Sequence, residues 1–522
     1  MMRGLNGLLA LACIGCVSVA TYAAQAQSAP AEWTTSSVDQ FRTGWQQGHS
    51  KFSPENVKNL KLLWKTKIPI KTMGLQSFRE PLMVNGITTA DGVKSETIVV
   101  GASNELAALD TDTGKVIWET KLAWKSAKPQ EPGEGRGFIC TNAQTATPVI
   151  TPAGNGARRL YVLTSDGYLR IVNPGTGAEE EPAIQVMAQP YGKPYGLNLV
   201  NNVIYTISGQ GCAGNANALY AVDLTTKKVA VQTPPQAGLW GTPGPSVASD
   251  GTIYFESSDG AYDAASGRLA TSFQGFTYAK GTLTLKDYYT PVNHEWLTKR
   301  DLDMNTTPVI FPYKGREIMV GSGKEGRYFL VDTRSMGGPN HDEPLYRSPL
   351  FSNADVNFQT EGTWGGLATW LDKDGTRWIL APIGGKPAVK FPTTYGENPN
   401  GGIIAMKLDD KSGKPVLDPV WLSRNMITAE PPVIVNGVVF TLAGGEFTGQ
   451  ANDEAGGLFS AEQRIKLSKP AKLYALDALT GKELYSSGDE IASFLHQAGV
   501  SVVGEKVVFG SFDGTIYCYG LK

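Results

Sequence analysis

The sequence predicts an all-β protein: one eight-bladed β-propeller of four-stranded blades, whose last blade is completed by an N-terminal strand. Two observations lead to this prediction. A strand–turn–strand motif recurs along the chain, and a segment near the N-terminus repeats the outer strand of that motif. The 522 residues include 60 glycines and 31 prolines, which suits many tight turns. We expect one propeller domain over residues 33–522.

The recurring motif is an alternating apolar strand that ends in Asp or Asn, then a short turn and a second strand. The Asp side chain can accept hydrogen bonds from turn N–H groups, and glycine supplies a positive φ. A strand resembling "TPVI" precedes many copies, so each unit holds four strands at spacings of roughly 40 to 77 residues. The copies are "LAALDTDTGKVIWETKL" (106–122), "LRIVNPGTGAE" (169–179), "LYAVDLTTKKV" (219–229), "GAYDAASGRL" (260–269), "YFLVDTRSMGG" (328–338), "IAMKLDDKSGK" (404–414) and "LYALDALTGKELY" (473–485).

Closure of the ring is predicted from the two ends of the chain. "VVFGSFDGTIYCYGLK" (507–522) begins an eighth unit and stops before its last strand. "KLLWKTKI" (61–68) matches "KVIWETKL" (115–122) position for position. We therefore expect an N-terminal strand at 59–69 to complete the last blade, which removes the exposed edges of an open sheet.

The first 26 residues predict a signal peptide. Arg3 precedes an apolar stretch at 7–20, and "AQAQ" offers a cleavage site after Ala26. The stretch is short for a membrane span and no second one follows, so we expect a periplasmic or secreted protein without a transmembrane span in the mature chain. A lipid anchor at Cys13 or Cys16 is an alternative.

Composition narrows the classes of partner. The net charge is −2, from 47 basic and 49 acidic residues without a basic run, which argues against nucleic acid. The mature chain keeps Cys140, Cys212 and Cys518, and an oxidising compartment predicts one pair and one leftover thiol. The sequence contains no Cys-x-x-Cys-His motif, so we expect no c-type haem in this chain.

The repeat, together with "FSPENVKNLKLLWK" (52–65), resembles that of the quinoproteins, eight-bladed propellers exemplified by alcohol dehydrogenases that use pyrroloquinoline quinone (PQQ). The resemblance covers nearly the whole mature chain and implies PQQ, with a calcium or lanthanide ion beside it. Non-catalytic relatives such as outer-membrane assembly scaffolds share the repeat, so activity has to be argued from the site residues.

"RDLDMNTTPV" (300–309) resembles the family segment that carries the catalytic carboxylate. The resemblance implies Asp301 as the base that removes the alcohol proton and Asp303 as an additional metal ligand. The alternative is that both side chains accept backbone hydrogen bonds in the inner loop of a blade.

Three further residues are assigned by the same resemblance. Lys324 in "GSGKEGRYFLVD" (321–332) would contact the quinone oxygens, and Trp240 in "AGLWGTPGPS" (237–246) would stack on the flat cofactor. Asp259 stands where the family has a metal-ligating Asn. A lysine in a turn and a structural tryptophan in a blade are both common, so each assignment has a structural alternative.

Three departures from the family pattern concern the same site. Cys212 stands where the family has a metal-ligating Glu, and a thiol is a poor ligand for calcium or a lanthanide. The family's adjacent pair of cysteines is reduced to Cys140, and the Arg that follows that pair has no counterpart in "TNAQTATPVI" (141–150). Because the family places both positions at one mouth of the ring, we expect a Cys140–Cys212 disulfide between neighbouring blades; a reactive thiol at either position is the alternative.

Two functions follow from these observations. The first is a quinoprotein oxidoreductase acting on an alcohol-type substrate and passing electrons to a separate cytochrome or other acceptor. The second is a non-catalytic propeller that serves as a binding or scaffold module in the cell envelope. The long loops at 127–138 and 385–402, rich in Gly, Pro and aromatic residues, suit a ligand-binding rim in either case.

Overall fold

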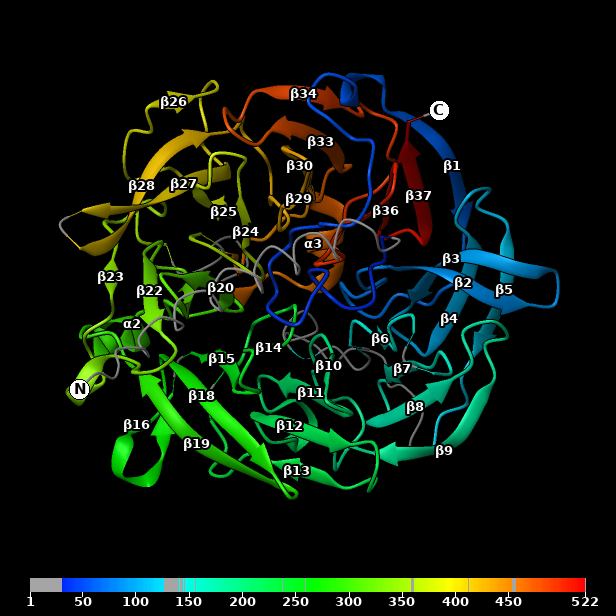
Figure 1. Cartoon of the computed structure of the whole chain (residues 1–522), viewed down its shortest axis with the longest axis horizontal. Coiled ribbons are helices and arrows are strands. Elements are labelled where there is room, and N and C mark those ends of the chain that lie inside the picture. The colour runs from blue at the N-terminus through cyan, green and yellow to red at the C-terminus, as the bar shows by residue number, and fades with distance from the viewer. Residues whose placement is uncertain are drawn as a thin grey trace, which may run out of the picture.

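The computed structural model describes residues 31–125, 140, 144, 146–154, 156–236, 238–258, 260–357, 361–411, 413–452 and 457–521. Eight sheets, each built on four antiparallel strands, surround a central axis like the blades of a propeller (Figure 1). The predicted fold class is therefore confirmed. Within the described residues, no helix is long and apolar enough to cross a membrane.

The blades follow one another around the ring in chain order. From the inner to the outer strand, the first four are β2 (Leu82–Thr89), β3 (Gly92–Val100), β4 (Glu105–Asp110) and β5 (Val116–Lys121); β6 (Val149–Ile150), β7 (Leu160–Leu163), β8 (Tyr168–Val172) and β9 (Glu179–Gln185); β10 (Asn198–Val200), β11 (Val203–Ser208), β12 (Ala218–Asp223) and β13 (Val229–Val231); and β14 (Ser246–Val247), β15 (Ile253–Ser257), β18 (Ser272–Ala279) and β19 (Thr282–Tyr289).

The other four blades complete the circle. They are β20 (Val309–Tyr313), β21 (Arg316–Ser322), β22 (Tyr328–Asp332) and β23 (Tyr346–Arg347); β24 (Ala368–Leu371), β25 (Arg377–Gly384), β27 (Gly401–Lys411) and β28 (Lys414–Leu422), extended by β26 (Thr393–Thr394); β29 (Val433–Val435), β30 (Val438–Ala443), β33 (Lys472–Asp477) and β34 (Glu483–Ser486); and β35 (Ser501–Val503), β36 (Lys506–Gly510), β37 (Thr515–Gly520) and β1 (Lys61–Lys67).

Short elements decorate the ring. Among the described residues they are the α-helices α2 (His294–Lys299) and α3 (Ala461–Leu467), the 3-10 turns η1 (Val57–Asn59), η2 (Cys212–Gly214), η3 (Ala264–Ser266) and η4 (Gly338–Asn340), and the hairpins β16 (Tyr262–Asp263)–β17 (Arg268–Leu269) and β31 (Ala451–Asn452)–β32 (Gly457–Leu458). Ser460 caps α3 with a capping box, in which Ser460 and Gln463 satisfy each other's backbone N–H groups.

The ring closes as the sequence predicts. β1 pairs with β37 in antiparallel register, from Lys61 opposite Gly520 to Lys67 opposite Thr515. The first and last strands of the ring thus lie side by side at the edge of Figure 1. Because the last blade gains its outer strand from the other end of the chain, the ring has no unpaired end.

The Asp of each motif organises the turn between two strands. Asp110 Oδ1 accepts hydrogen bonds from the backbone N–H groups of Asp112 and Thr113, both at 3.0 Å. Asp223 and Asp477 make the same pair of bonds in their own blades. The turn chemistry expected from the sequence therefore fixes the connections between the two outermost strands of these blades.

The Trp and Gly of the motif dock one blade on the next. Trp64 lies over Gly114 in the turn of the following blade, and a Cβ at Gly114 would come 2.5 Å from the indole. Trp64 Nε1 also donates to the Thr111 carbonyl at 3.1 Å. Trp118 contacts Gly177 in the same way. Glycine is required at these positions because the indole occupies the space of a side chain, and because φ is positive there.

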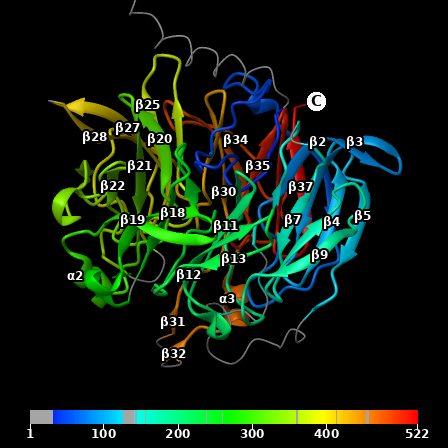
Figure 2. The same cartoon turned by 60° about the horizontal axis from the view of Figure 1, so that its bottom comes forward.

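The N-terminal segment 33–46 has no regular strand, yet it is tied to the inner strand of every blade. It crosses the middle of the ring (blue in Figure 1) and lies toward the end of the axis opposite α3 (Figure 2). Its contacts, in ring order, are Trp33 with Met83, Thr34 with Ile150, Thr35 with Leu197, Gln40 with Val247, Phe41 with Ile310, Thr43 with Thr369, Gly44 with Ile434 and Gln46 with Val502. The sequence gave no warning of this segment, which acts as a central clamp.

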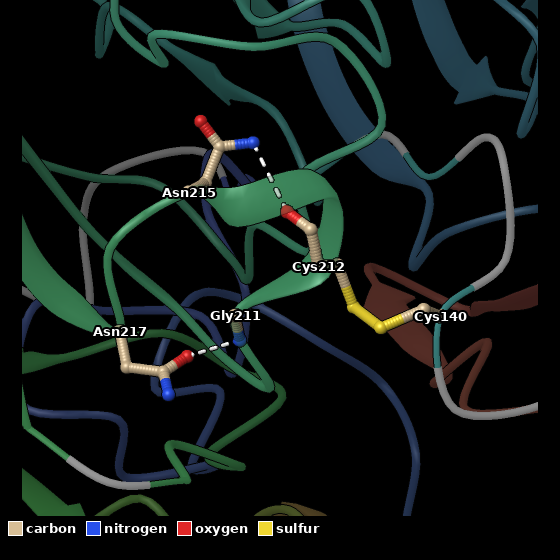
Figure 3. Close-up of a disulfide and its surroundings, with 5 residues drawn as sticks. All are labelled: Cys140, Gly211, Cys212, Asn215 and Asn217. Carbon is tan, nitrogen blue, oxygen red and sulfur yellow. Dashed lines mark hydrogen bonds between the residues drawn. A yellow bond between two sulfur atoms is a disulfide. The ribbon is translucent and has the colours of Figure 1, made fainter.

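A disulfide joins Cys140 to Cys212, 72 residues apart (Figure 3). Cys140 lies on the connection that leads into β6, and Cys212 begins η2 in the next blade, so the bond links neighbouring blades as expected. Asn215 Nδ2 donates to the Cys212 carbonyl at 3.2 Å and holds the 3-10 turn. Cys518 is buried and reduced, and burial raises the pKa of its thiol to about 12.

Candidate functional site

A cavity of about 520 Å³ lies on the propeller axis, a size typical of ligand sites. Segments from all eight blades contribute to its wall, and Ser36, Ser37 and Gly44 of the N-terminal clamp also line it. In a propeller, the loops before the inner strands converge on the axis, so residues far apart in the sequence meet there. The cavity is therefore the natural place for a functional site in this fold.

One wall of the cavity is built from Asp301, Asp303 and Lys324. Lys324 Nζ lies 2.6 Å from Asp303 Oδ2 and 3.3 Å from Asp301 Oδ1, and it also donates to the Asp301 carbonyl at 3.0 Å. The side chains of Lys324 and Asp303 are 2% and 1% exposed, whereas that of Asp301 is 47% exposed. Lys324 is thus held by a buried carboxylate, and Asp301 is the acid of this pair that a ligand can reach.

The backbone explains why these three residues meet. α2 ends just before Asp301, which adopts a left-handed conformation with φ of +54°. Met304 then bridges to Gly323, where a Cβ would lie 2.3 Å from the Asp303 carbonyl oxygen. The close approach of the two segments places the Lys324 side chain between the two carboxylates. Left-handed non-glycine residues are uncommon and recur at functional sites.

Two tryptophans form a second part of the wall. Trp240 and Trp364 pack edge to face, with ring centroids 5.9 Å apart. Lys193 Nζ lies 4.6 Å from the Trp240 ring centroid, and Lys324 Nζ lies 5.3 Å from that of Trp364. Both indole N–H groups are buried and make no hydrogen bond within the described part of the chain. Two aromatic faces and two unsatisfied donors are therefore available to a ligand.

The opposite side of the cavity holds a buried acidic group. Arg464 donates to Glu446 at 2.7 Å, and His496 Nδ1 lies 2.7 Å from the other oxygen of the same carboxylate. Burial alone would raise the pKa of Glu446, but His496 and Arg464 hold it below its usual value. Glu430 behaves differently: burial, with the neighbouring Glu446 charge, raises its pKa to about 8. Glu430 is thus protonated at neutral pH.

Glu430→Gln is expected to be more stable than the wild type at about pH 8 and to lose this advantage toward about pH 5. The Glu430 carboxyl keeps its proton to about pH 8 when folded but ionises near its usual pKa of 4.5 when unfolded. Folding therefore takes up a proton in this window, and stability falls as pH rises, by at most about 1.4 kcal/mol per pH unit. Glutamine is neutral in both states.

The measurement is the urea midpoint of wild type and variant at several pH values between 5 and 8, where about four points suffice. Glu397→Gln, at an exposed position, is the control and should leave the pH dependence unchanged. A stability difference that stays constant with pH would contradict a raised Glu430 pKa.

The structure brings four residues selected from the sequence into one cavity: Asp301, Asp303, Lys324 and Trp240. Asp259 lies outside the described residues, so its assignment as a metal ligand stays a prediction. The structure adds residues that the sequence reasoning missed: Trp364, Lys193, Glu430, Glu446, Arg464 and His496. A systematic reading of the residues just before each inner strand would have found Glu430, which precedes "PPVI" at 431–434.

The described residues do not form the metal site that the family resemblance implies. No group of three or more His, Cys, Asp or Glu side chains among them has an arrangement that could hold a metal ion. The cation against Asp303 is the Lys324 ammonium, and Cys212 is in the disulfide. A hard cation needs several oxygen ligands, and the described wall supplies no such set.

A planar quinone suits the cavity better than a metal ion does. The volume is sufficient, the indoles of Trp240 and Trp364 offer apolar faces, and their unsatisfied N–H groups can donate to an acceptor-rich ligand. Lys324 adds a fixed positive charge. These residues fit a quinone such as PQQ.

Comparisons with known proteins agree with the fold. Residues 33–182 match the family model described as "Glucose/ethanol/alcohol dehydrogenase, beta-propeller domain". No curated protein matches the sequence. Among solved structures, the quinohemoprotein alcohol dehydrogenase ADHIIG of Pseudomonas putida HK5 superposes with a TM-score of 0.58 at 15% identity, covering 96% of this chain and 82% of the other.

Two more solved structures are similar. The quinohemoprotein alcohol dehydrogenase of Comamonas testosteroni gives a TM-score of 0.56 at 15% identity, covering 96% of this chain and 82% of the other. A europium-containing methanol dehydrogenase gives 0.54 at 13% identity, covering 95% and 91%. The resemblance predicted from the sequence is thus confirmed: this chain has the eight-bladed propeller fold of the quinoprotein alcohol dehydrogenases.

Proposed function

We propose that the axial cavity is the active site of a quinone-dependent oxidoreductase that oxidises an alcohol-type substrate. The observation that carries the proposal is the convergence of Asp301, Asp303, Lys324 and Trp240, from three separate sequence segments, on one cavity. Bound PQQ would supply the carbonyl group that accepts the hydride. Electrons would pass to a separate acceptor such as a cytochrome.

The chain's own residues divide the work between them. Asp301, which is half exposed to the cavity, accepts the proton of the substrate hydroxyl. Asp303 is buried and holds Lys324 through a charge-assisted hydrogen bond. Lys324 is thereby oriented to donate to an oxygen on which negative charge develops. Trp240 and Trp364 bind the planar ligand and exclude water from one side of the cavity.

The test is reconstitution of the purified full chain with PQQ alone, with PQQ and Ca²⁺, and with PQQ and La³⁺. The expected result is saturable quenching of tryptophan fluorescence by PQQ and alcohol-dependent reduction of an artificial dye. The absence of both quinone binding and dye reduction in all three mixtures would overturn the proposal. The metal arms test the remaining calcium or lanthanide prediction, which includes the undescribed Asp259.

A second candidate function is a propeller that binds a small molecule, glycan or protein without chemistry. The lack of a metal-ligand group among the described residues favours it. Gly385, Pro399 and Asn400 of the loop at 385–402 line the cavity, as a binding rim would; the loop at 127–138 lies outside the described residues. Ligand binding that persists without quinone, with no dye reduction in any mixture, would favour this function.

The proposed cellular location is the periplasm or the exterior. It rests on the predicted signal peptide at residues 1–26, which lies outside the described residues, and on the Cys140–Cys212 disulfide, a bond that persists in oxidising compartments.

A further inference from the structure

Lys193 is a buried lysine of the axial cavity to which the predicted oxidation assigns no role. It is 6% exposed and lines the cavity, with Nζ over the face of Trp240. Its backbone is fixed from both sides, because Gly209 N–H donates to the Lys193 carbonyl at 3.1 Å and Tyr195 N–H donates to Ile207 at 3.0 Å. The amine is therefore held at one place in the wall.

The surroundings of Lys193 differ from those of Lys324 in the same cavity. Lys324 is paired with two carboxylates. Lys193 faces a neutral indole, and the charges that act on it from neighbouring elements are the guanidinium groups of Arg79 and Arg464. Burial, reinforced by these two cations, lowers the pKa of Lys193 to about 7. A substantial fraction of Lys193 is thus an unprotonated amine at neutral pH.

We propose that Lys193 is a nucleophilic amine that condenses with the carbonyl group of an aldehyde bound in the axial cavity. A cavity that encloses the amine and an adjacent aromatic face favour a planar, aromatic aldehyde stacked near Trp240. The assignment concerns covalent capture of a carbonyl compound and needs neither quinone nor metal. It therefore goes beyond the proposed oxidation and stands or falls separately.

The reaction balances without a further reactant. The lone pair of the Lys193 amine forms a bond to the aldehyde carbon, while the carbonyl oxygen takes a proton and becomes the hydroxyl of a carbinolamine. Loss of that hydroxyl and the second amine proton as water gives the imine. One water is released for each carbonyl captured, and nothing is oxidised or reduced.

The test is site mapping after reductive trapping. The full chain is incubated at about pH 7 with benzaldehyde and sodium cyanoborohydride, which reduces an imine to a stable amine, and labelled peptides are quantified by mass spectrometry. An ordinary exposed lysine is almost wholly protonated at this pH. We expect Lys193 to be labelled at least about tenfold faster than the exposed Lys280 and Lys390, an allowance that leaves room for slower entry into the cavity.

Lys324 is the internal control, because any probe that reaches Lys193 enters the same cavity. Its ion pairs should keep its labelling below that of Lys193. Lys193→Met should remove the fast phase, whereas Lys280→Met should not. Labelling of Lys193 no faster than that of Lys280 and Lys390 would overturn the proposal, and this comparison needs only the wild-type protein. The assay contains no quinone, so its failure would leave the proposed oxidation untouched.

Discussion

Asp301→Asn is expected to lower the turnover number for alcohol-dependent dye reduction by about 10²- to 10⁴-fold, because it removes the group that accepts the substrate proton. Asparagine is a matched replacement in two respects. It has nearly the same shape, and it is among the residues that tolerate the left-handed φ of +54° found at position 301. The measurement is steady-state kinetics of the PQQ-reconstituted protein, with circular dichroism to confirm the fold.

Two variants make the Asp301 result specific. Asp374→Asn changes an exposed acid in the turn before β25 and should leave the turnover number unchanged. Asp303→Asn should also lower activity, since it removes the buried carboxylate 2.6 Å from Lys324, but the loss should come with weaker PQQ binding. Unchanged turnover in Asp301→Asn would rule out Asp301 as the proton acceptor.

The fold could be predicted from the sequence because the propeller is encoded locally and repeatedly. Each Asp bonds to the next two or three backbone N–H groups, and each Trp requires a glycine in the neighbouring blade. These requirements leave a fixed pattern of Asp, Gly and Trp in every well-formed repeat. The match of 61–68 to 115–122 carried the closure of the ring in the same way, and β1 indeed pairs with β37.

The site could be predicted only in part. Asp301, Asp303, Lys324 and Trp240 were selected by resemblance to short family segments, and all four line the cavity. The opposite wall comes from irregular loops without a repeat pattern, so no periodic signal marked residues such as His496. Its character depends on which side chains meet across the axis, and no local pattern of sequence states that.

The central clamp at 33–46 was missed for a related reason. Most of its bonds to the inner strands use backbone groups, which any residue except proline can supply, so little of the pattern shows in the side chains. Arg42 is the exception. A fully buried arginine in a segment without regular structure indicates an organising role, because a guanidinium needs several acceptors to compensate for its lost hydration.

Arg42→Met is therefore expected to destabilise the protein by about 3–5 kcal/mol. Arg42 donates to Thr35 Oγ1 at 2.8 Å and to the carbonyl oxygens of Ser36, Leu197 and Pro245 at 2.7, 3.0 and 3.3 Å. Methionine fills much of the volume but donates to none of them. Buried carbonyl groups of the clamp and of two blades would then lack partners, which costs more than the loss of an exposed hydrogen bond.

The apparent unfolding midpoint in urea and in thermal scans is the measurement, because a chain of this size need not unfold in two states. Arg334→Met removes an exposed arginine and should leave both midpoints within error of the wild type. Arg42→Lys keeps the charge without the forked geometry and should fall between the two. Equal midpoints for Arg42→Met and wild type would contradict the clamp. Because Ser36 and Ser37 of this segment line the axial cavity, the destabilised variant should also bind PQQ more weakly, linking the stability of the ring to the shape of its site.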